Sequence, residues 1–479
     1  YEIGSGLVGS EMCIRDSNIH NIVNHSEAKL LFVGDQAWEN LNEEAMPLLM
    51  GVVLLTDFTP VVCRDERLME AFEHRNAIYG SRYPKNFRPE HICYRKEQSP
   101  EELAVINYTS GTTGYSKGVM LPYRSLWSNI AYCHEMLPVR PGDHIVSMLP
   151  LGHVFGMVYD FLYGFSAGAH LYFLTRMPSP KIIAQSFSEI KPRVISCVPL
   201  IVEKIIKKNI LPLIDNKIGK LLLRMPIVND KIKADMRKKA MDVFGGNFDE
   251  IIIGGAPFNA DVERFLKQIG FPYTIAYGMT ECGPIICSSR WETLKLASCG
   301  KATTRMEVKI DSPDPQNVAG EIICRGTNLM LGYYKNADAT SQIIDVNGWL
   351  HTGDLATMDA DGYVTVRGRS KNMLLTSSGQ NIYPEEIESK LNNMPYVSES
   401  LIVLQHDKLV ALIYPDFDDA FAHGLQQADI EKAMEANRNE LNLLLPTYCQ
   451  ITKVKIHFEE FEKTAKKSIK RFMYQEAKG

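Results

Sequence analysis

Residues 108–119 combine glycine, hydroxyl and lysine side chains in an order that suits phosphate binding. The segment reads Tyr-Thr-Ser-Gly-Thr-Thr-Gly-Tyr-Ser-Lys-Gly-Val. Glycines let backbone N–H groups converge on an anion, hydroxyl groups add donors, and the lysine adds positive charge. The Walker pattern differs, because it places Lys and Ser/Thr directly after its second glycine and continues as a helix. Here a strand-like segment follows, so we predict a phosphate-binding loop between two strands, with a plain surface turn as the alternative. The candidate phosphate ligands are Thr109, Ser110, Gly111, Thr112, Thr113, Gly114 and Lys117.

Two predicted strands end in polar segments at 254–257 and 277–281. In an open α/β sheet, ligands bind beyond the carboxyl ends of the strands, and we expect these two ends to be neighbours. The glycines of the first segment allow a flat group to approach, Tyr277 offers a stacking face, and Thr280 and Glu281 offer oxygen ligands for Mg²⁺. The alternative is a tight strand exit beside an ordinary core tyrosine. The candidate nucleotide-binding residues are Gly254, Gly255, Ala256, Pro257, Tyr277, Gly278 and Met279.

A third cluster lies around a predicted hairpin whose turn contains Asp361 and Gly362. Asp354 precedes this turn and Arg369 follows it. A carboxylate accepts hydrogen bonds from a sugar diol, and a guanidinium donates to the same sugar. The pair therefore predicts a ribose site, with a turn aspartate and a surface arginine as the alternative.

The composition is that of an ordinary globular chain. With 52 basic and 57 acidic residues the net charge is −5, so no overall positive field favours nucleic acid as a partner. The ten cysteines include no C-x-x-C pair, which predicts reduced thiols and a cytoplasmic protein rather than a zinc or disulfide framework. No apolar run reaches the ~18 residues that a membrane-spanning helix needs. The nearest candidate, 154–174, is broken by Asp160 and His170 and predicts a buried helix and strand.

The first seventeen residues match nothing in the pattern that follows them. They lack the basic and apolar regions of a signal peptide, and 9–17 resemble translated sequencing-adapter sequence. We therefore interpret 1–17 as a non-native segment. After this segment we expect strands at 29–33 and 51–56, with a helix at 36–45 between them. The regular pattern thus begins in the middle of a series of alternating strands and helices. We expect the opening strands of the large domain to be missing.

Alternation of strands and helices continues along most of the chain and predicts an α/β fold. We expect a large N-terminal domain, 18–370, of layered, mostly parallel sheets covered by helices. Beyond Lys371 the pattern changes to short strands at 401–404 and 409–414 with one helix near 429–441. This change predicts a small α+β domain at 371–479.

These segments, in this order, resemble the motifs of the adenylate-forming superfamily, which includes acyl-CoA synthetases, firefly luciferase and peptide-synthetase adenylation domains. The resemblance extends from about residue 18 to residue 471. It is closest to long-chain fatty-acid–CoA ligases, on the basis of 194–205 and 329–336. It implies that a fatty acid and MgATP give an acyl-adenylate and pyrophosphate, and that the acyl group then passes to coenzyme A. Such a reaction depends on positioning and on charge neutralisation rather than on a nucleophilic side chain.

The resemblance also gives a role to each candidate residue. It places 109–117 around the phosphates, with Ser116 where the family usually has proline, and it places His153 beside the substrate carboxylate. The other implied roles are adenine binding by 254–257 and Tyr277, phosphate and Mg²⁺ binding by Thr280 and Glu281, ribose binding by Asp354 and Arg369, the hinge of a mobile lid domain at Lys371, and the pantetheine tunnel at Gly379.

The chain departs from the family pattern near its C-terminus. Ser468 stands where the family usually has its adenylation lysine, directly before an isoleucine. Residues two apart share a face of an extended segment, so Lys470 is our first substitute for that lysine. Lys467 is the second substitute, and a weakened first half-reaction is the third possibility.

Three questions of substrate and partner stay open at this level. The acyl acceptor is CoA or the phosphopantetheine of a carrier protein, and a non-catalytic nucleotide- or acyl-binding protein is the third reading. The apolar stretch 154–174 either walls an acyl tunnel or packs as ordinary core. Residues 204–239 hold eleven Lys/Arg against three Asp, which suits peripheral contact with an anionic membrane, although we favour a solvated helical face.

Overall fold

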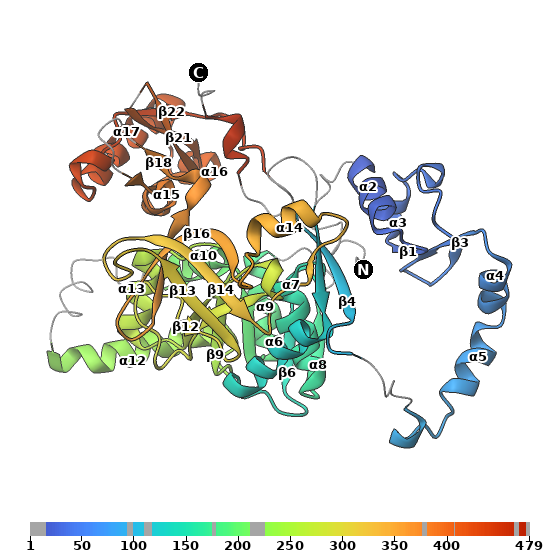
Figure 1. The fold of residues 1–479 in the computed structure, drawn as a ribbon. Coiled ribbons are helices and arrows are strands. Elements are labelled where there is room, and N and C mark those ends of the chain that lie inside the picture. Colours follow the sequence, from blue (N-terminus) through green and yellow to red (C-terminus); the bar gives the residue numbers. More distant parts are fainter. Residues whose placement is uncertain are drawn as a thin grey trace.

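The computed structural model describes residues 16–92, 99–109, 117–174, 179–210, 226–375, 381–406, 408–463 and 469–475. It confirms the α/β class and the arrangement of a large N-terminal domain with a small C-terminal one (Figure 1). The small domain is coloured orange to red in that view and stands over the sheets of the large domain. No helix in the described ranges is both long and apolar enough to span a membrane.

The central sheet has the strand order β12-β11-β10-β9-β8. Its strands β8, β9 and β10 are parallel, and β11 and β12 continue the sheet in antiparallel pairing. Every residue of β9 is buried, as expected of a strand covered on both faces. The strands are β8 (Val194–Cys197), β9 (Glu250–Gly254), β10 (Tyr273–Gly278), β11 (Ile285–Ser288) and β12 (Lys301–Ala302).

Helices connect and cover these strands, namely α9 (Pro180–Ile190), α10 (Pro199–Asn209), α12 (Pro226–Val243) and α13 (Ala260–Ile269). The side chain of Asn259 caps α13 by accepting the N–H groups of Asp261 and Val262 at 2.9 and 3.0 Å. This helix and its cap confirm the sequence prediction. The short parallel pair β6 (His144–Ser147) and β7 (His170–Phe173) is joined by α7 (Val154–Gly156), the π-helical η3 (Met157–Tyr163) and α8 (Gly164–Ser166). The stretch 154–174 is therefore a largely buried helical segment and a strand, but the prediction that the strand is buried is wrong, because three of the four residues of β7 are exposed.

Two further sheets of the large domain are antiparallel, because short turns join most of their strands. One has the order β15-β5-β4, beside helix α6 (Tyr123–Met136). The other has the order β13-β14-β16-β17, beside helix α14 (Ala337–Ile343). Their strands are β4 (Leu103–Thr109), β5 (Lys117–Pro122), β15 (Gly332–Tyr333), β13 (Met306–Asp311), β14 (Gly320–Gly326), β16 (Leu350–Met358) and β17 (Val364–Arg369). Among the described strands of the large domain, parallel pairing is therefore found in β8–β9–β10 of the central sheet, in β6–β7 and between β1 (Leu30–Val33) and β2 (Gly51–Leu54).

The N-terminal part carries β1 (Leu30–Val33) parallel to β2 (Gly51–Leu54), as expected, and β3 (Pro60–Cys63) antiparallel to β2. The prediction of one helix at 36–45 is wrong, because the structure has two short helices there, α3 (Asp35–Trp38) and η1 (Glu43–Ala45). Asn42 is extended and its side chain accepts the Glu44 N–H, so a new turn starts there. The other helices are α2 (Asp16–Ser26), α4 (Glu66–Glu73), α5 (Arg75–Arg82) and η2 (Pro89–His91). Residues 1–15 of the segment interpreted as non-native lie outside the described residues.

The small domain begins beyond η6 (Ser370–Asn372) with the strand pair β18 (Leu374–Leu375) and β19 (Asn381–Ile382). Its larger sheet has the order β20-β21-β22 and buries an apolar core against α15 and α17. The predicted helix near 429–441 is α17, while α15 and α16 were not predicted. The elements are α15 (Pro384–Leu391), β20 (Val397–Gln405), β21 (Lys408–Pro415), α16 (Phe417–Ala422), α17 (Gln427–Leu443), η7 (Thr447–Cys449), β22 (Lys453–Ile456) and η8 (Arg471–Met473).

Candidate functional site

The predicted phosphate loop joins the strands of an antiparallel hairpin. Thr109 ends β4, Lys117 begins β5, and the two residues face each other across the ladder. This arrangement confirms strand, loop and strand in place of a Walker-type helix. Five of the predicted ligands, Ser110, Gly111, Thr112, Thr113 and Gly114, lie outside the described residues. The structure therefore places the two ends of the loop, and both ends carry candidate ligands.

Lys117 and Glu281 lie on either side of Tyr333. The Lys117 ammonium is 4.7 Å from the centre of the Tyr333 ring, and the Tyr333 hydroxyl donates a 2.8 Å hydrogen bond to Glu281. Burial raises the pKa of the Tyr333 hydroxyl, and the nearby Glu281 carboxylate raises it further, so Tyr333 stays a donor. Thr280 and Glu281 are both buried in the short helical turn η5 (Thr280–Cys282). Sequence analysis missed Tyr333, although the residue falls in the 329–336 segment that carried the family resemblance.

The two strand ends predicted to be neighbours are neighbours. Gly254 of β9 is paired in register with Ala276 of β10, so the segments that follow them leave the sheet side by side. Gly255 is exposed and has a φ of +89°, which favours glycine. A Cβ on Gly278 would lie 2.0 Å from the Pro284 carbonyl oxygen, so only glycine fits there. The strand ends thus have a bare, accessible backbone that a planar ring can approach.

Asp354 is held between an aromatic hydroxyl and a guanidinium. Tyr277 donates a 2.7 Å hydrogen bond to one carboxylate oxygen of Asp354, and the Nε of Arg369 lies 2.9 Å from the other. Asp354 and Arg369 face each other across β16 and β17. Burial raises the pKa of Asp354, while the charge of Arg369 and the Tyr277 hydrogen bond oppose that rise. Three predicted nucleotide-binding residues from three strands therefore form one cluster.

Lys371 connects this cluster with the phosphate loop. It lies in η6, directly after β17. Burial lowers the pKa of Lys371, the positive charges of Arg369 and Lys117 lower it further, and Asp354 opposes this. Lys371 is thus within electrostatic range of Lys117 and Asp354 alike. Several cationic groups converge on one place, which suits a polyanion such as a triphosphate.

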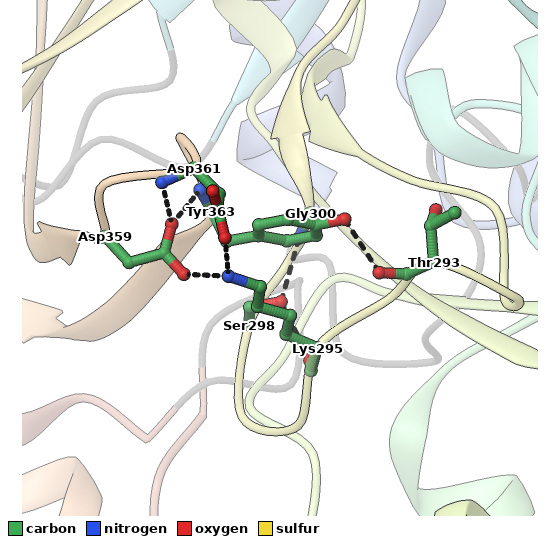
Figure 2. A network of polar contacts seen from close by, with 7 residues as sticks. All are labelled: Thr293, Lys295, Ser298, Gly300, Asp359, Asp361 and Tyr363. Atoms are coloured by element: carbon green, nitrogen blue, oxygen red, sulfur yellow. Dashed lines mark hydrogen bonds and ion pairs between the residues drawn. The ribbon is translucent and has the colours of Figure 1, made fainter.

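A polar network anchors the turn between β16 and β17 (Figure 2). The Lys295 ammonium contacts Asp359 at 2.6 Å and Asp361 at 2.5 Å, and the Tyr363 hydroxyl donates a 2.7 Å hydrogen bond to the Thr293 carbonyl oxygen. Asp359 also accepts the backbone N–H of Tyr363 at 2.9 Å. The hairpin that carries Asp354 at one end is thereby tied to the loop after β11.

His153 lies where the phosphate hairpin meets the central sheet. It directly precedes α7, and the amide of Asn107 on β4 donates a 2.7 Å hydrogen bond to the neighbouring Gly152 carbonyl. Phe155 of α7 packs on Gly254, because a Cβ added to that glycine would lie 3.3 Å from the Phe155 ring. The residues on either side of His153 therefore contact the two candidate nucleotide-binding elements, and the role of His153 itself stays a prediction.

The C-terminal lysine candidates are not joined to this cluster by any contact among the described residues. The ammonium of Lys470 lies 3.4 Å from a carboxylate oxygen of Glu462, within the small domain. Lys467 and Ser468 lie outside the described residues, as does the predicted CoA-contacting Gly379. Their roles stay predictions.

The described residues fit a Mg²⁺ ion that is shared with a substrate. Among them, no group of three or more His, Cys, Asp or Glu side chains forms a metal site. Mg²⁺ bound with substrate phosphates typically takes only one or two protein carboxylates. The buried oxygens of Glu281 and Thr280, beside Lys117 and Tyr333, match that donor set. The eight described cysteines are all free.

The basic segment 204–239 is only partly available for membrane contact. Its residues 211–225 lie outside the described residues. In α12, Met236 and Ala240 are buried in the core of the large domain, and Lys207 of α10 donates a hydrogen bond to Asn393. The apolar face of α12 therefore faces the protein, which agrees with a solvated helical face.

Comparisons with known proteins agree with this geometry. A family model described as AMP-binding enzyme matches residues 6–334, and one described as AMP-binding enzyme C-terminal domain matches residues 371–477. A long-chain-fatty-acid–CoA ligase of Escherichia coli O157:H7 is 30% identical over 341 residues, which cover 69% of this chain and 54% of the ligase. The long-chain-fatty-acid–CoA ligase ACSBG1 of Mus musculus is 27% identical over 344 residues, which cover 66% of this chain and 47% of that protein. The chain thus spans about half the length of these relatives.

Solved structures with the same fold include nucleotide and adenylate complexes. The anthranilate CoA ligase AuaEII with anthranoyl-AMP superposes with a TM-score of 0.73 at 19% identity, over 97% of this chain and 81% of that one. The o-succinylbenzoate CoA synthetase MenE of Bacillus subtilis with ATP and magnesium gives 0.68 at 20% identity, over 95% and 81%. At these identities the structures establish the fold alone.

Proposed function

Because this chain belongs to the AMP-binding enzyme family, we propose that it activates a carboxylic acid with ATP and transfers the acyl group to coenzyme A. The observation that carries this proposal is the hydrogen-bonded cluster of Tyr277, Asp354 and Arg369. Lys371 is within electrostatic range both of Asp354 in this cluster and of Lys117 at the end of the phosphate loop. A ribose binds at the carboxylate, adenine lies over the bare strand ends, and the phosphates extend towards Lys117. One nucleotide spans all three elements.

Each residue then has a physical task in the first half-reaction. Lys117 and the N–H groups of its loop hold the β- and γ-phosphates, while the Tyr333 hydroxyl fixes the Glu281 carboxylate in place. Glu281 and Thr280 would hold Mg²⁺, which would supply positive charge to neutralise the departing pyrophosphate. His153 orients the attacking carboxylate, and Lys470, or Lys467 in its place, approaches from the small domain as that domain turns about Lys371. Gly379, which lies outside the described residues, keeps its predicted role towards the pantetheine of CoA in the second half-reaction.

We propose a long-chain fatty acid as the acid. The support comes from two relatives, both long-chain-fatty-acid–CoA ligases, at 27% and 30% identity. The largely buried stretch from α7 through η3, which packs beside His153, provides an apolar wall for such a chain. A long acyl chain and CoA as the acceptor thiol are thus both part of this proposal.

A product assay tests the proposal. The protein is incubated with ATP, Mg²⁺ and palmitate, with CoA, with a phosphopantetheinylated carrier protein, or without a thiol. We expect palmitoyl-CoA and stoichiometric AMP only in the arm with CoA. Acyl transfer only in the arm with the carrier protein would show that the acceptor is a protein thiol and not CoA. Nucleotide binding without any AMP would reject catalysis and leave a non-catalytic binding protein.

A further inference from the structure

Arg471, the residue after the candidate catalytic Lys470, lies between two carboxylates of helix α15. Its guanidinium is paired with Glu388 and lies 3.9 Å from Glu385. The Arg471 side chain is only 15% exposed, and those of Glu388 and Glu385 are 9% and 18% exposed. Both contacts come from the same guanidinium nitrogen, Nη2, and all three side chains are largely enclosed, so the pair restricts where Arg471 can lie.

Glu388 cannot easily release this partner. Its other contact is the backbone N–H of Ile402 on β20, at 2.6 Å. Burial raises the pKa of Glu388 to about 7, while the charge of Arg471 opposes that rise. The Glu388 carboxyl group thus contacts both the Arg471 guanidinium and the backbone of β20, so the pair holds the C-terminal segment on α15.

Glu385 carries the connection towards the hinge. It accepts a 2.7 Å hydrogen bond from the side chain of Asn372, the residue that follows Lys371. A Cβ on Gly368, at the end of β17, would lie 2.8 Å from the Glu385 carboxylate, so the two elements are in close contact. Burial raises the pKa of Asp354, and the charge of Glu385 adds to that effect. One face of α15 therefore lies between the C-terminal segment, the hinge and the candidate ribose site.

A second anchor fixes the other end of the same segment. Tyr474 packs edge-on against Phe461 with ring centres 5.2 Å apart, and its hydroxyl accepts the Glu462 N–H at 2.8 Å. Ile469 forms an isolated bridge with Lys463. Lys470 thus lies on a short segment that is held at both ends. Of the contacts named here, only the ion pair of Arg471 connects this segment to α15.

We propose that Arg471 is a positioning residue: its ion pair with Glu388 and Glu385 fixes Lys470 relative to the hinge at Lys371, so that rotation of the small domain delivers the lysine to the nucleotide. This inference rests on the proposed function, because it assumes an adenylation half-reaction. It assigns Arg471 no contact with substrate. Asn372 and Glu385 form the hinge side of the same link.

The two half-reactions are measured separately in the full chain. ATP–pyrophosphate exchange with palmitate reports adenylation, and palmitoyl-CoA formation from preformed palmitoyl-adenylate reports thioester formation. We expect Arg471→Gln to lower exchange by roughly 100-fold, the cost of misplacing a reacting group by about 1 Å, with thioester formation unchanged. Arg471→Lys should recover part of the exchange, because an ammonium keeps the positive charge opposite Glu388 but not the length and shape of the guanidinium. Asn372→Ala should show a smaller loss with the same split.

Arg438→Gln is the matched control, since Arg438 is also a paired arginine of the small domain, 2.7 Å from Glu435, but it lies on α17 away from Lys470. It should leave both half-reactions unchanged. A parallel fall of both reactions in Arg471→Gln, with a lower melting temperature, would show a purely structural residue and overturn the inference. Unchanged exchange would overturn it as well. Absence of exchange in the unsubstituted protein would instead reject the proposed function on which the inference rests.

Discussion

The Tyr277 hydroxyl donates a 2.7 Å hydrogen bond to Asp354, which lies 77 residues further along the chain. The bond joins the end of β10 to β16, two strands of different sheets. A carboxylate offers about four acceptor sites, so Asp354 can bind a ribose diol while it keeps both Tyr277 and Arg369. The carboxylate of the proposed ribose site is therefore held in place by two protein side chains.

Replacing Asp354 by asparagine tests the ribose site. The substitution removes a charged acceptor, and hydrogen bonds to charged groups contribute about 1.5–3 kcal/mol, so we expect the KM for ATP to rise roughly 10- to 100-fold. Steady-state kinetics with ATP as the varied substrate measure the change. Asp361→Asn is the control, because Asp361 lies on the turn of the same hairpin and is 68% exposed. Equal effects of the two substitutions would argue against a ribose at Asp354.

The Tyr333–Glu281 hydrogen bond leads to a second prediction. We expect Tyr333→Phe to raise the Mg²⁺ concentration needed for half-maximal pyrophosphate exchange by about tenfold, because Glu281 loses the donor that orients it. The measurement is a Mg²⁺ titration at saturating ATP. Tyr334→Phe is a close control, since the Tyr334 hydroxyl contacts Glu27 at 3.3 Å and not Glu281. An unchanged titration for Tyr333→Phe would remove Glu281 from the metal site.

The two C-terminal lysines make a third prediction. If Lys470 acts in adenylation, Lys470→Ala should abolish most pyrophosphate exchange and leave thioester formation from preformed acyl-adenylate intact. Lys467→Ala should then be nearly silent, and the reverse result would transfer the role to Lys467. Lys455→Ala is the control, because Lys455 contacts Gln405 at 2.6 Å in the same small domain. Full exchange in both lysine variants would show that neither one acts.

Local signals were enough to predict much of the fold. Asn259 and the helix after it, the strand ends at Gly254 and Ala276, and the hairpin around Asp361 are all encoded within about ten residues each. Parallel strand pairing follows from such alternation, because a crossover helix sits between paired strands. The helix expected at 36–45 was wrong because a single asparagine hydrogen bond interrupts it.

Contacts between distant segments could not be predicted from spacing alone. Tyr333 reaches Glu281 across 52 positions, and Arg471 reaches Glu388 across 83. Neither residue carries a local signal of such a partner, since both tyrosine and arginine also occur at positions without any such contact. Family resemblance brought Tyr277 and Asp354 into one site, but only the folded chain shows that they touch.

Glu250 gives a prediction about stability and pH. It is 1% exposed at the start of β9, with one oxygen 2.8 Å from the Trp291 N–H. Burial raises the pKa of Glu250 to about 8, although the charge of Arg290 opposes the rise, whereas an unfolded glutamate titrates near 4.3. Between these values the folded state holds a proton that the unfolded state has released. The free energy of unfolding should therefore fall as the pH rises from about 4.3 to about 8, and then level off.

Urea unfolding at pH 5, 6.5 and 8 compares the protein with Glu250→Gln, which keeps the acceptor for Trp291 and cannot ionise. We expect the variant to gain stability relative to the original chain as the pH rises, by at most a few kcal/mol, since one unit of pKa corresponds to about 1.4 kcal/mol. Glu307→Gln, at a residue whose side chain is 59% exposed, should show no such trend. Parallel curves for the original chain and Glu250→Gln would mean that Glu250 is ionised in the folded state. The strand that leads to Gly254 would then have to accommodate a buried charge. The next three residues of that strand, Ile251, Ile252 and Ile253, are all apolar and offer such a charge no side-chain partner.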